Sequence, residues 1–257
     1  MAESTKTDHD RLLFNTIASQ YARKDMVRSS VLVRRYELFF ALSPFLRQLG
    51  SQGIIIDIGC GIGAPAIYLR GHYGQYIGID HSEKMIENAQ CFHHGNDKVS
   101  FLHGDVTTQS FQTPPADLIL ANGALHHMTH LEQVFQNIGH LARPGAFFIA
   151  LEPQAGNPAI QLMRWLRGKV DPSYSRDQHY FKRAELFDLL HRHGLHDIAL
   201  TYQGYFSTPF GQIILPYQPL AILCSRIALS FDRVLDQYLP SPLRFLSWHI
   251  IARARFP

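Results

Sequence analysis

Three glycines at alternate positions, Gly59, Gly61 and Gly63, stand where the sequence could bind a nucleotide-like ligand. They follow the β-branched residues 54–56, a run that is typical of a strand buried on both faces of a sheet. Glycine permits the positive φ of a sharp turn and lets a ligand approach bare backbone. A helix expected over residues 64–70 would point its free N–H groups at that ligand. The stretch therefore predicts a binding site at the carboxyl end of the first strand.

The acid before this loop helps to decide which ligand is bound, because the glycine spacing also satisfies the dinucleotide-binding pattern. Asp57 stands where a dinucleotide fold normally has an apolar residue. A buried carboxylate is costly unless it accepts hydrogen bonds. We therefore expect Asp57 to brace the glycine loop or to hold an ammonium group through water. A plain tight turn in an α/β domain is the alternative.

Two further acids end predicted strands. Residues 75–80 read as a short strand that ends in Asp80, and a carboxylate at this place can accept both hydroxyls of a ribose. Asp105 follows a third predicted strand, residues 98–102, and could accept a hydrogen bond from an exocyclic amine. A role in an N-cap or an Asx turn explains Asp105 equally well.

Two adjacent histidines, His126 and His127, follow a fourth predicted strand over residues 116–121. Histidine titrates near neutrality, so either residue could act as a catalytic base if the acceptor must lose a proton. A structural role explains His127 equally well.

Three other residues are candidates for the wall of an acceptor pocket. Glu152 stands at the mouth of a fifth predicted strand, residues 146–151. His179 and Tyr180 stand at the end of a polar insertion, residues 156–180, of a kind that often forms a lid or substrate wall.

Steady alternation of strand and helix predicts a parallel, doubly wound α/β sheet. Ser82 is the expected N-cap of one intervening helix, and Arg143-Pro144-Gly145 is expected to stop a helix over residues 131–142. The other expected elements are helices over 10–21 (capped by Asp10), 30–49, 181–193 and 220–239, and strands over 195–205 and 246–255 that pair like a hairpin at the sheet edge.

Composition indicates an ordinary globular protein. The chain has 257 residues, of which 46% are hydrophobic and 18% charged, and its net charge of +3 is far from a nucleic-acid-binding signature. Its three cysteines lack paired or metal-type spacing, so we expect a reducing cytoplasm and no metal site. Residues 1–11 lack the apolar core of a secretory signal, and we expect no membrane span.

Taken together, the motifs resemble class I S-adenosylmethionine-dependent methyltransferases. The matching pieces are residues 55–63, 77–82, 104–105, 117–119 with 125–127, and 141–145, which stand in that family's order and spacing. The resemblance implies a Rossmann-like, mostly parallel seven-stranded sheet with helices on both faces and an antiparallel last strand. It implies a single domain over 1–257, with N-terminal helices (1–50) over the cofactor site, a cofactor-binding core (51–153), an inserted lid (154–182) and C-terminal elements (183–257).

The resemblance also implies the cofactor, S-adenosylmethionine, and the product, S-adenosylhomocysteine. The residues carried over are Tyr21, Gly59, Cys60, Gly61 and Asn122 around the methionine portion, Asp80 at the ribose, and His81, Met85, Asp105 and Val106 around the adenine.

Methyl transfer from a sulfonium is an in-line displacement, and holding the acceptor in place can supply about 7–11 kcal/mol of the barrier reduction. The fourth strand ends in Asn122-Gly123-Ala124 and lacks the Pro-Pro-aromatic turn of enzymes that methylate base or amide nitrogen. A small-molecule acceptor is therefore favoured over a nucleic acid.

Apolar residues over 206–229 and around Trp165 predict a hydrophobic pocket and allow contact with a membrane surface. The alternative for residues 220–239 is a helix that merely covers the sheet.

Two other functions fit parts of the pattern. A nicotinamide-dependent oxidoreductase shares the glycine loop and Asp80 but gives no reason for Asp57 or Asp105. A non-catalytic module would bind the cofactor without turnover and act through a protein partner.

Overall fold

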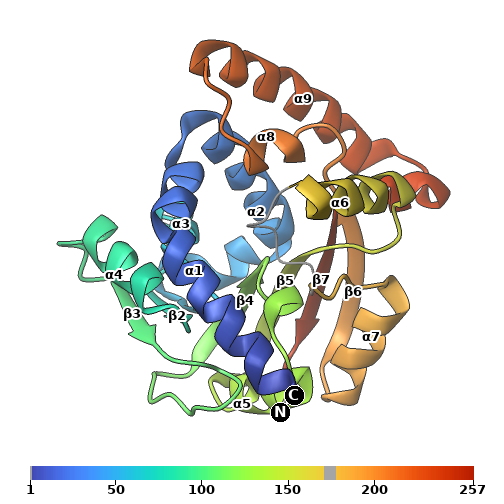
Figure 1. Ribbon diagram of the computed structural model, residues 1–257. Helices are drawn as coiled ribbons and strands as arrows, with labels where there is room; N and C mark the ends of the chain where they lie inside the picture. Colours follow the sequence, from blue (N-terminus) through green and yellow to red (C-terminus); the bar gives the residue numbers. More distant parts are fainter. Residues whose placement is uncertain (1, 171–177) are drawn as a thin grey trace.

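Seven strands form one sheet in the computed structural model, which describes residues 2–170 and 178–257 (Figure 1). The strands are β1 (Ile54–Ile58), β2 (Gln75–Asp80), β3 (Val99–His103), β4 (Ala116–Asn122), β5 (Ala142–Pro153), β6 (His196–Gln203) and β7 (His249–Arg255). Their order is β3-β2-β1-β4-β5-β7-β6. Neighbours pair in parallel except β7, which is antiparallel to both β5 and β6. The predicted doubly wound sheet with an antiparallel last strand is confirmed.

Helices cover both faces of the sheet and connect its strands (Figure 1). The helices are α1 (Ala2–Met26), α2 (Arg28–Leu49), α3 (Ala64–Tyr68), α4 (Glu83–Phe92), α5 (Leu131–Gly139), α6 (Pro158–Val170), α7 (Arg183–Arg192), α8 (Thr208–Gln212) and α9 (Gln218–Tyr238), with short 3-10 turns η1 (Gly50–Gln52), η2 (Leu125–His127) and η3 (Ser241–Leu246). The strand order reverses between β1 and β4, and ligands of such sheets bind at the carboxyl ends of the strands beside this point.

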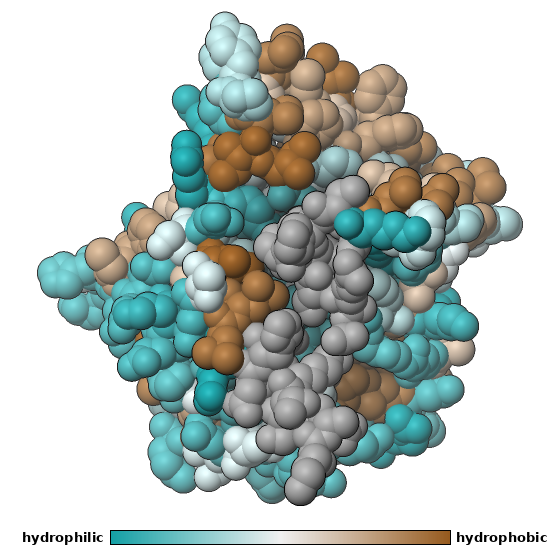
Figure 2. Space-filling model, in the orientation of Figure 1, coloured by the Kyte–Doolittle hydropathy of each residue, from teal (hydrophilic) through white to brown (hydrophobic). Residues whose placement is uncertain are grey.

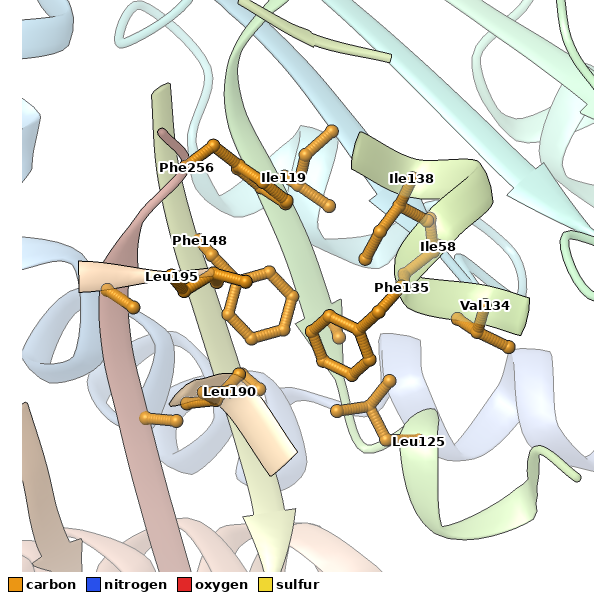
Figure 3. Close-up of a cluster of buried hydrophobic side chains, with 14 of the residues drawn as sticks. Ile58, Ile119, Leu125, Val134, Phe135, Ile138, Phe148, Leu190, Leu195 and Phe256 are labelled. Atoms are coloured by element: carbon orange, nitrogen blue, oxygen red, sulfur yellow. The ribbon is translucent and has the colours of Figure 1, made fainter. Parts of the chain in front are cut away.

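Two apolar cores lie on opposite faces of the sheet, because successive strand side chains point to opposite sides. Ile56 and Ile58 of β1 belong to the core under α5 and α7, which Figure 3 shows with Phe135 and Leu190. Ile55 belongs to the other core, under α1 to α4. The β-branched run at the start of β1 is therefore buried on both faces, as its composition predicts.

The first helix is longer than the sequence pattern predicts. Its apolar spacing indicates residues 10–21, but α1 begins at Ala2, so Asp10 lies inside the helix and the predicted capping role is wrong. The cap predicted for α4 is confirmed, because the Ser82 side chain accepts a hydrogen bond from the Met85 N–H at 3.2 Å.

The helix expected to run to residue 142 ends at Gly139, and Arg143-Pro144-Gly145 lies inside β5. The register of β4 on β5 shifts between the pairs Ala116–Ala142 and Leu118–Phe147, so these three residues form an irregularity within the strand rather than a helix stop. In the sequence alone, proline and glycine indicate the end of a helix. In the folded sheet, the same residues are accommodated as a bulge in a strand.

The C-terminal strands pair antiparallel as predicted, but β7 lies between β5 and β6, so β6 is the sheet edge. The predicted insertion contains α6, and its residues 171–177 lie outside the described residues. In the described part of the chain, no helix combines the length and apolar character needed to cross a bilayer.

Candidate active site

The glycine loop, residues 59–63, turns the chain from β1 into α3. The N–H groups of Gly59 and Cys60 both donate to the carbonyl of Ile79 on β2, at 2.8 and 3.1 Å. Gly59, Gly61 and Gly63 have φ of +68°, +54° and +71°, a region that other residues rarely adopt. A Cβ at Gly59 would lie 2.6 Å from the Cβ of Ala124, whereas one at Gly61 would have nothing within 4 Å. The loop therefore packs on the turn after β4 and is open at Gly61.

Asp80, the last residue of β2, holds this loop. Its Oδ2 accepts the N–H of Gly61 at 2.8 Å, and its Oδ1 accepts the N–H of Ser82 at 2.9 Å. Each carboxylate oxygen can accept a second hydrogen bond. Asp80 is therefore fixed beside the open side of Gly61, where its remaining acceptor positions could hold two hydroxyls. The ribose-binding role itself stays a prediction.

Asp57, expected either to brace the glycine loop or to hold an ammonium group through water, does not brace the loop, and the second role stays a prediction. The carboxyl of Asp57 is fully buried and accepts the hydroxyl of Tyr76 instead. Burial raises the pKa of Asp57 to about 7, and the hydrogen bond from Tyr76 opposes that rise. Its Oδ1 has no hydrogen-bond partner among the described residues. The loop-bracing role belongs to Asp80, because the side chain at 57 points into the core under α2 and α3.

Asp105 lies two residues beyond the end of β3. This strand pairs with β2, which ends in Asp80. The N–H of Gly104 donates to the Asp80 carbonyl at 3.0 Å, which places both acids at the same edge of the sheet. The Oδ1 of Asp105 accepts the N–H of Thr107 at 2.8 Å, so the alternative reading as an Asx turn is observed. The carbonyl of Val106 accepts the Asn137 amide at 2.7 Å. The adenine contacts expected of Asp105 and Val106 stay predictions.

Phe14 of α1 brings three predicted site residues together. Its ring meets the rings of Tyr21, His81 and His127 edge-on, at centroid distances of 5.8, 6.0 and 5.0 Å. The next residue, Asn15, accepts the Ser82 hydroxyl at 2.7 Å. These contacts hold α1 across the carboxyl ends of the strands, and Figure 1 shows it crossing in front of the sheet.

Neither Phe14 nor Asn15 stands out in the sequence, because an apolar residue in a helical stripe reads as core and a polar neighbour as surface. Ala124, the residue against Gly59, carries no signal at all.

Other predicted cofactor residues are mostly buried. The Cys60 side chain packs against β2, since a Cβ at Gly78 would lie 2.6 Å from its sulfur, and burial raises the pKa of the thiol. Met85 is buried in the core beside α4. Asn122 ends β4, paired with Leu151 of β5. Their contacts with a cofactor stay predictions.

Glu152, predicted to touch the acceptor, is instead fully buried beneath the turn after β4. Its Oε1 accepts the N–H groups of Ala124 and Leu125 at 3.0 and 2.9 Å, and its Oε2 lies 2.7 Å from Nδ1 of His126. Burial raises the pKa of Glu152 to about 7, against the lowering effect of the backbone N–H groups. Glu152 is therefore a positioning residue for residues 124–127, which we call the histidine turn.

The histidine turn lies beside Tyr180. The rings of His126 and His127 are 4.1 Å apart, and the ring of Tyr180 is 6.4 Å from that of His126. The guanidinium of Arg164 lies 3.9 Å from the centre of the Tyr180 ring. Tyr180 therefore lies near the candidate bases, and Arg164 is a neighbour that the sequence pattern did not indicate.

His179 is joined to this turn by backbone only. Its N–H donates to the carbonyl of His126 at 3.1 Å, while its exposed imidazole pairs with Glu185 of α7. The side chain is directed to α7, so the predicted acceptor contact of His179 is not supported. Among the described residues no group of three or more His, Cys, Asp or Glu could hold a metal ion.

This arrangement fits the group that the sequence motifs imply. Bare backbone at Gly61, a fixed carboxylate at Asp80 and a second acid one strand away are what an adenosyl ligand with a ribose and an amine would need.

Comparison with known proteins agrees with the motifs. Residues 56–150 match a family model described as a methyltransferase domain. A relative named "Probable tocopherol O-methyltransferase, chloroplastic", from Oryza sativa subsp. japonica, is 29% identical over 66% of this chain. A sterol 24-C-methyltransferase from Pneumocystis carinii is 28% identical over 48% of it. The chain covers only 45% and 33% of the length of these two relatives.

Solved structures share the fold. An S-adenosylmethionine-dependent methyltransferase from Thermotoga maritima superposes with a TM-score of 0.61 at 14% identity, covering 95% of this chain and 98% of that one. The strand order, the glycine loop and the matched domain lead to one conclusion. Residues 56–150 are similar to a methyltransferase domain, and the chain has the fold of an S-adenosylmethionine-dependent methyltransferase of known structure.

Proposed function

We propose that the chain transfers a methyl group from S-adenosylmethionine to a small, largely apolar organic acceptor. The observation that carries this proposal is the Asp80–Gly61 hydrogen bond beside the open backbone of the glycine loop. When bound, the cofactor would supply a sulfonium methyl group that the acceptor can attack in line, with S-adenosylhomocysteine as the leaving group. The chain has to bind it, orient the acceptor and exclude water.

Glu152 prepares the histidine turn for proton removal. An ionised Glu152 accepts the Nδ1–H of His126, which makes Nε2 of that ring the proton acceptor. The same carboxylate holds the backbone of residues 124–125, so the position of the turn and the tautomer of His126 depend on one group. This arrangement favours His126 over His127 as the base, if the acceptor loses a proton.

The names of the curated relatives support an apolar acceptor, since tocopherol and sterol are largely hydrocarbon. Helix α6 carries exposed apolar side chains and begins five residues after the end of β5. It therefore lies close in the chain to Glu152, which holds the histidine turn. We propose a small-molecule acceptor rather than a nucleic acid, chemistry without a metal ion, and a cytoplasmic location. The three free thiols support a reducing compartment.

Calorimetric titration with S-adenosylhomocysteine and with NADH tests the cofactor. Saturable binding of the former alone is expected, and binding of NADH alone would overturn the proposal in favour of an oxidoreductase. Incubation of the protein and cell extract with methyl-labelled cofactor then tests turnover. Label should enter the organic-solvent fraction, and binding without any transfer would indicate a non-catalytic module.

His126→Gln and His127→Gln separate the two candidate bases. Loss of turnover with retained S-adenosylhomocysteine affinity in the first variant alone would support His126. If both variants match the parent at every pH, the transfer needs neither ring.

A further inference from the structure

An apolar stripe runs along the outer face of α9. Its members are half-exposed or more and recur at helical spacing over the whole helix: Leu220, Leu223, Ile227, Phe231, Val234 and Tyr238. Phe231, for example, keeps 58% of its surface exposed. A stripe that would normally pack on a core is here turned to solvent.

The buried face of the same helix carries two acids, Asp232 and Asp236, that bind the rest of the protein. Asp232 is fully buried and accepts the N–H groups of Tyr205, Phe206 and Ser207 at 3.1, 2.8 and 2.9 Å. Asp236 accepts the Tyr36 hydroxyl at 2.8 Å and the Gly204 N–H at 3.1 Å. These bonds fix the rotation of α9, so its apolar stripe faces outward as a consequence of the fold.

Neighbouring elements extend the apolar surface. The side chain of Asn157, next to α6, donates to the carbonyl of Leu246 in η3 at 2.5 Å, and this contact joins α6 to the segment that follows α9. The exposed apolar residues of these elements are Leu162, Met163, Trp165 and Leu166 of α6, Ile213, Ile214 and Tyr217 before α9, and Leu243, Phe245 and Leu246 of η3. Figure 2 shows hydrophobic residues gathered over the region of α9 and α6. We call the stripe and these residues together the α6–α9 face.

Among the described residues of the α6–α9 face, the exposed charges have one sign. Both acids of α9 are buried, whereas its basic residues Arg226 and Arg233 are exposed. The sequence of α6 contains no acid, and the exposed Lys169 lies 3.8 Å from the centre of the Trp165 ring. Basic side chains beside exposed apolar and aromatic groups match an anionic bilayer, because the apolar groups enter the acyl boundary while the cations remain with the headgroups.

From this combination we propose that the α6–α9 face docks on the surface of a bilayer that contains anionic lipids, with α9 lying in the plane of the interface. A second copy of the chain is a poorer occupant, because a symmetric contact would bring Arg226 and Arg233 of both copies together. The described side chains of this face include no exposed acid that could pair with them. The docking does not depend on the proposed methyl transfer.

Sedimentation with vesicles tests the proposal on the full chain. Phosphatidylcholine vesicles with a third of phosphatidylglycerol should bind the protein, and pure phosphatidylcholine vesicles at least tenfold more weakly. The double variant I227N/F231N should lose at least tenfold in affinity for the mixed vesicles. R226Q/R233Q should lose about fivefold for each arginine, and the loss should diminish at high salt.

Matched controls lie elsewhere on the surface. F187N removes an exposed aromatic ring of α7, and K98Q removes an exposed cation before β3, and neither should change vesicle binding. Equal binding to both kinds of vesicle, or binding that survives I227N/F231N, would overturn the proposal. Failure to sediment with any vesicle would overturn it too, and analytical ultracentrifugation would then show whether I227N/F231N breaks a dimer instead.

Discussion

Asp80 and Gly61 are joined by a hydrogen bond of 2.8 Å from the loop N–H to the Oδ2 of the carboxylate. One side chain thus shapes the glycine loop and offers its remaining lone pairs to a ligand. We expect Asp80→Ala to raise the dissociation constant for S-adenosylhomocysteine at least tenfold, which corresponds to about 1.4 kcal/mol. Asp80→Asn keeps one acceptor oxygen and should lie between the parent and the alanine variant. Calorimetry measures both, and an unchanged affinity in Asp80→Ala would remove this residue from the ribose site.

Gly59 and Gly61 differ in what a methyl group would meet. Both have positive φ, so each alanine variant carries backbone strain of about 1 kcal/mol. Gly59→Ala adds a clash with Ala124 and should lower the free energy of unfolding further, whereas Gly61→Ala should mainly obstruct the ligand. Urea unfolding and S-adenosylhomocysteine titration of the two variants should therefore rank them in opposite orders. The same ranking in both measurements would contradict this account of the loop.

The sequence predicts the elements of this site better than their mutual contacts. β2 is found at the predicted residues, and Ser82 caps α4, because both features depend on local pattern. That Asp80 rather than Asp57 holds the glycine loop depends on which face of β1 meets Tyr76, and no sequence spacing predicts that contact. The sequence predicts Glu152 at the end of the correct strand, but the burial of its side chain depends on how the turn after β4 folds over β5.

The α6–α9 face illustrates the same limit. An apolar stripe at helical spacing reads identically whether a core or a bilayer covers it. In the structure, the exposed side chains of the stripe and the buried acids of α9 show that the stripe is turned outward.

Asp57 should make stability depend on pH. Its folded-state pKa of about 7 lies above its ordinary value, so its contribution is complete at low pH and is lost as pH rises through 7. The free energy of unfolding of the parent should therefore fall relative to Asp57→Asn by up to about 1.4 kcal/mol per pH unit between pH 5 and pH 7. Glu37 and Glu152, whose pKa values are also raised to about 7 by burial, affect parent and variant alike.

Urea unfolding at pH 5, 6, 7 and 8 measures this difference. The exposed Asp97→Asn variant serves as the control and should follow the parent at each pH. If the free energies of unfolding of the parent and Asp57→Asn differ by the same amount at every pH, the carboxyl of Asp57 is already ionised at pH 5.

Phe14 should matter for binding more than for stability. Phe14→Ala removes the ring that holds α1 against His81 and His127, so we expect about tenfold weaker S-adenosylhomocysteine binding. Leu12→Ala changes a side chain of the same helix that is 61% exposed, and should bind like the parent. Equal affinities in all three proteins would mean that α1 does not contribute to the cofactor site.

The position of β7 has a consequence for synthesis. Although it is the last strand in sequence, β7 lies between β5 and β6 and pairs with both over nearly its full length. The sheet is incomplete until residue 255 has left the ribosome. Until then β5 and β6 lack their shared partner strand and expose unpaired backbone groups to other chains. A nascent chain should therefore depend on chaperones until β7 has been synthesised, and deletion of residues 249–257 should yield aggregates rather than a smaller folded domain.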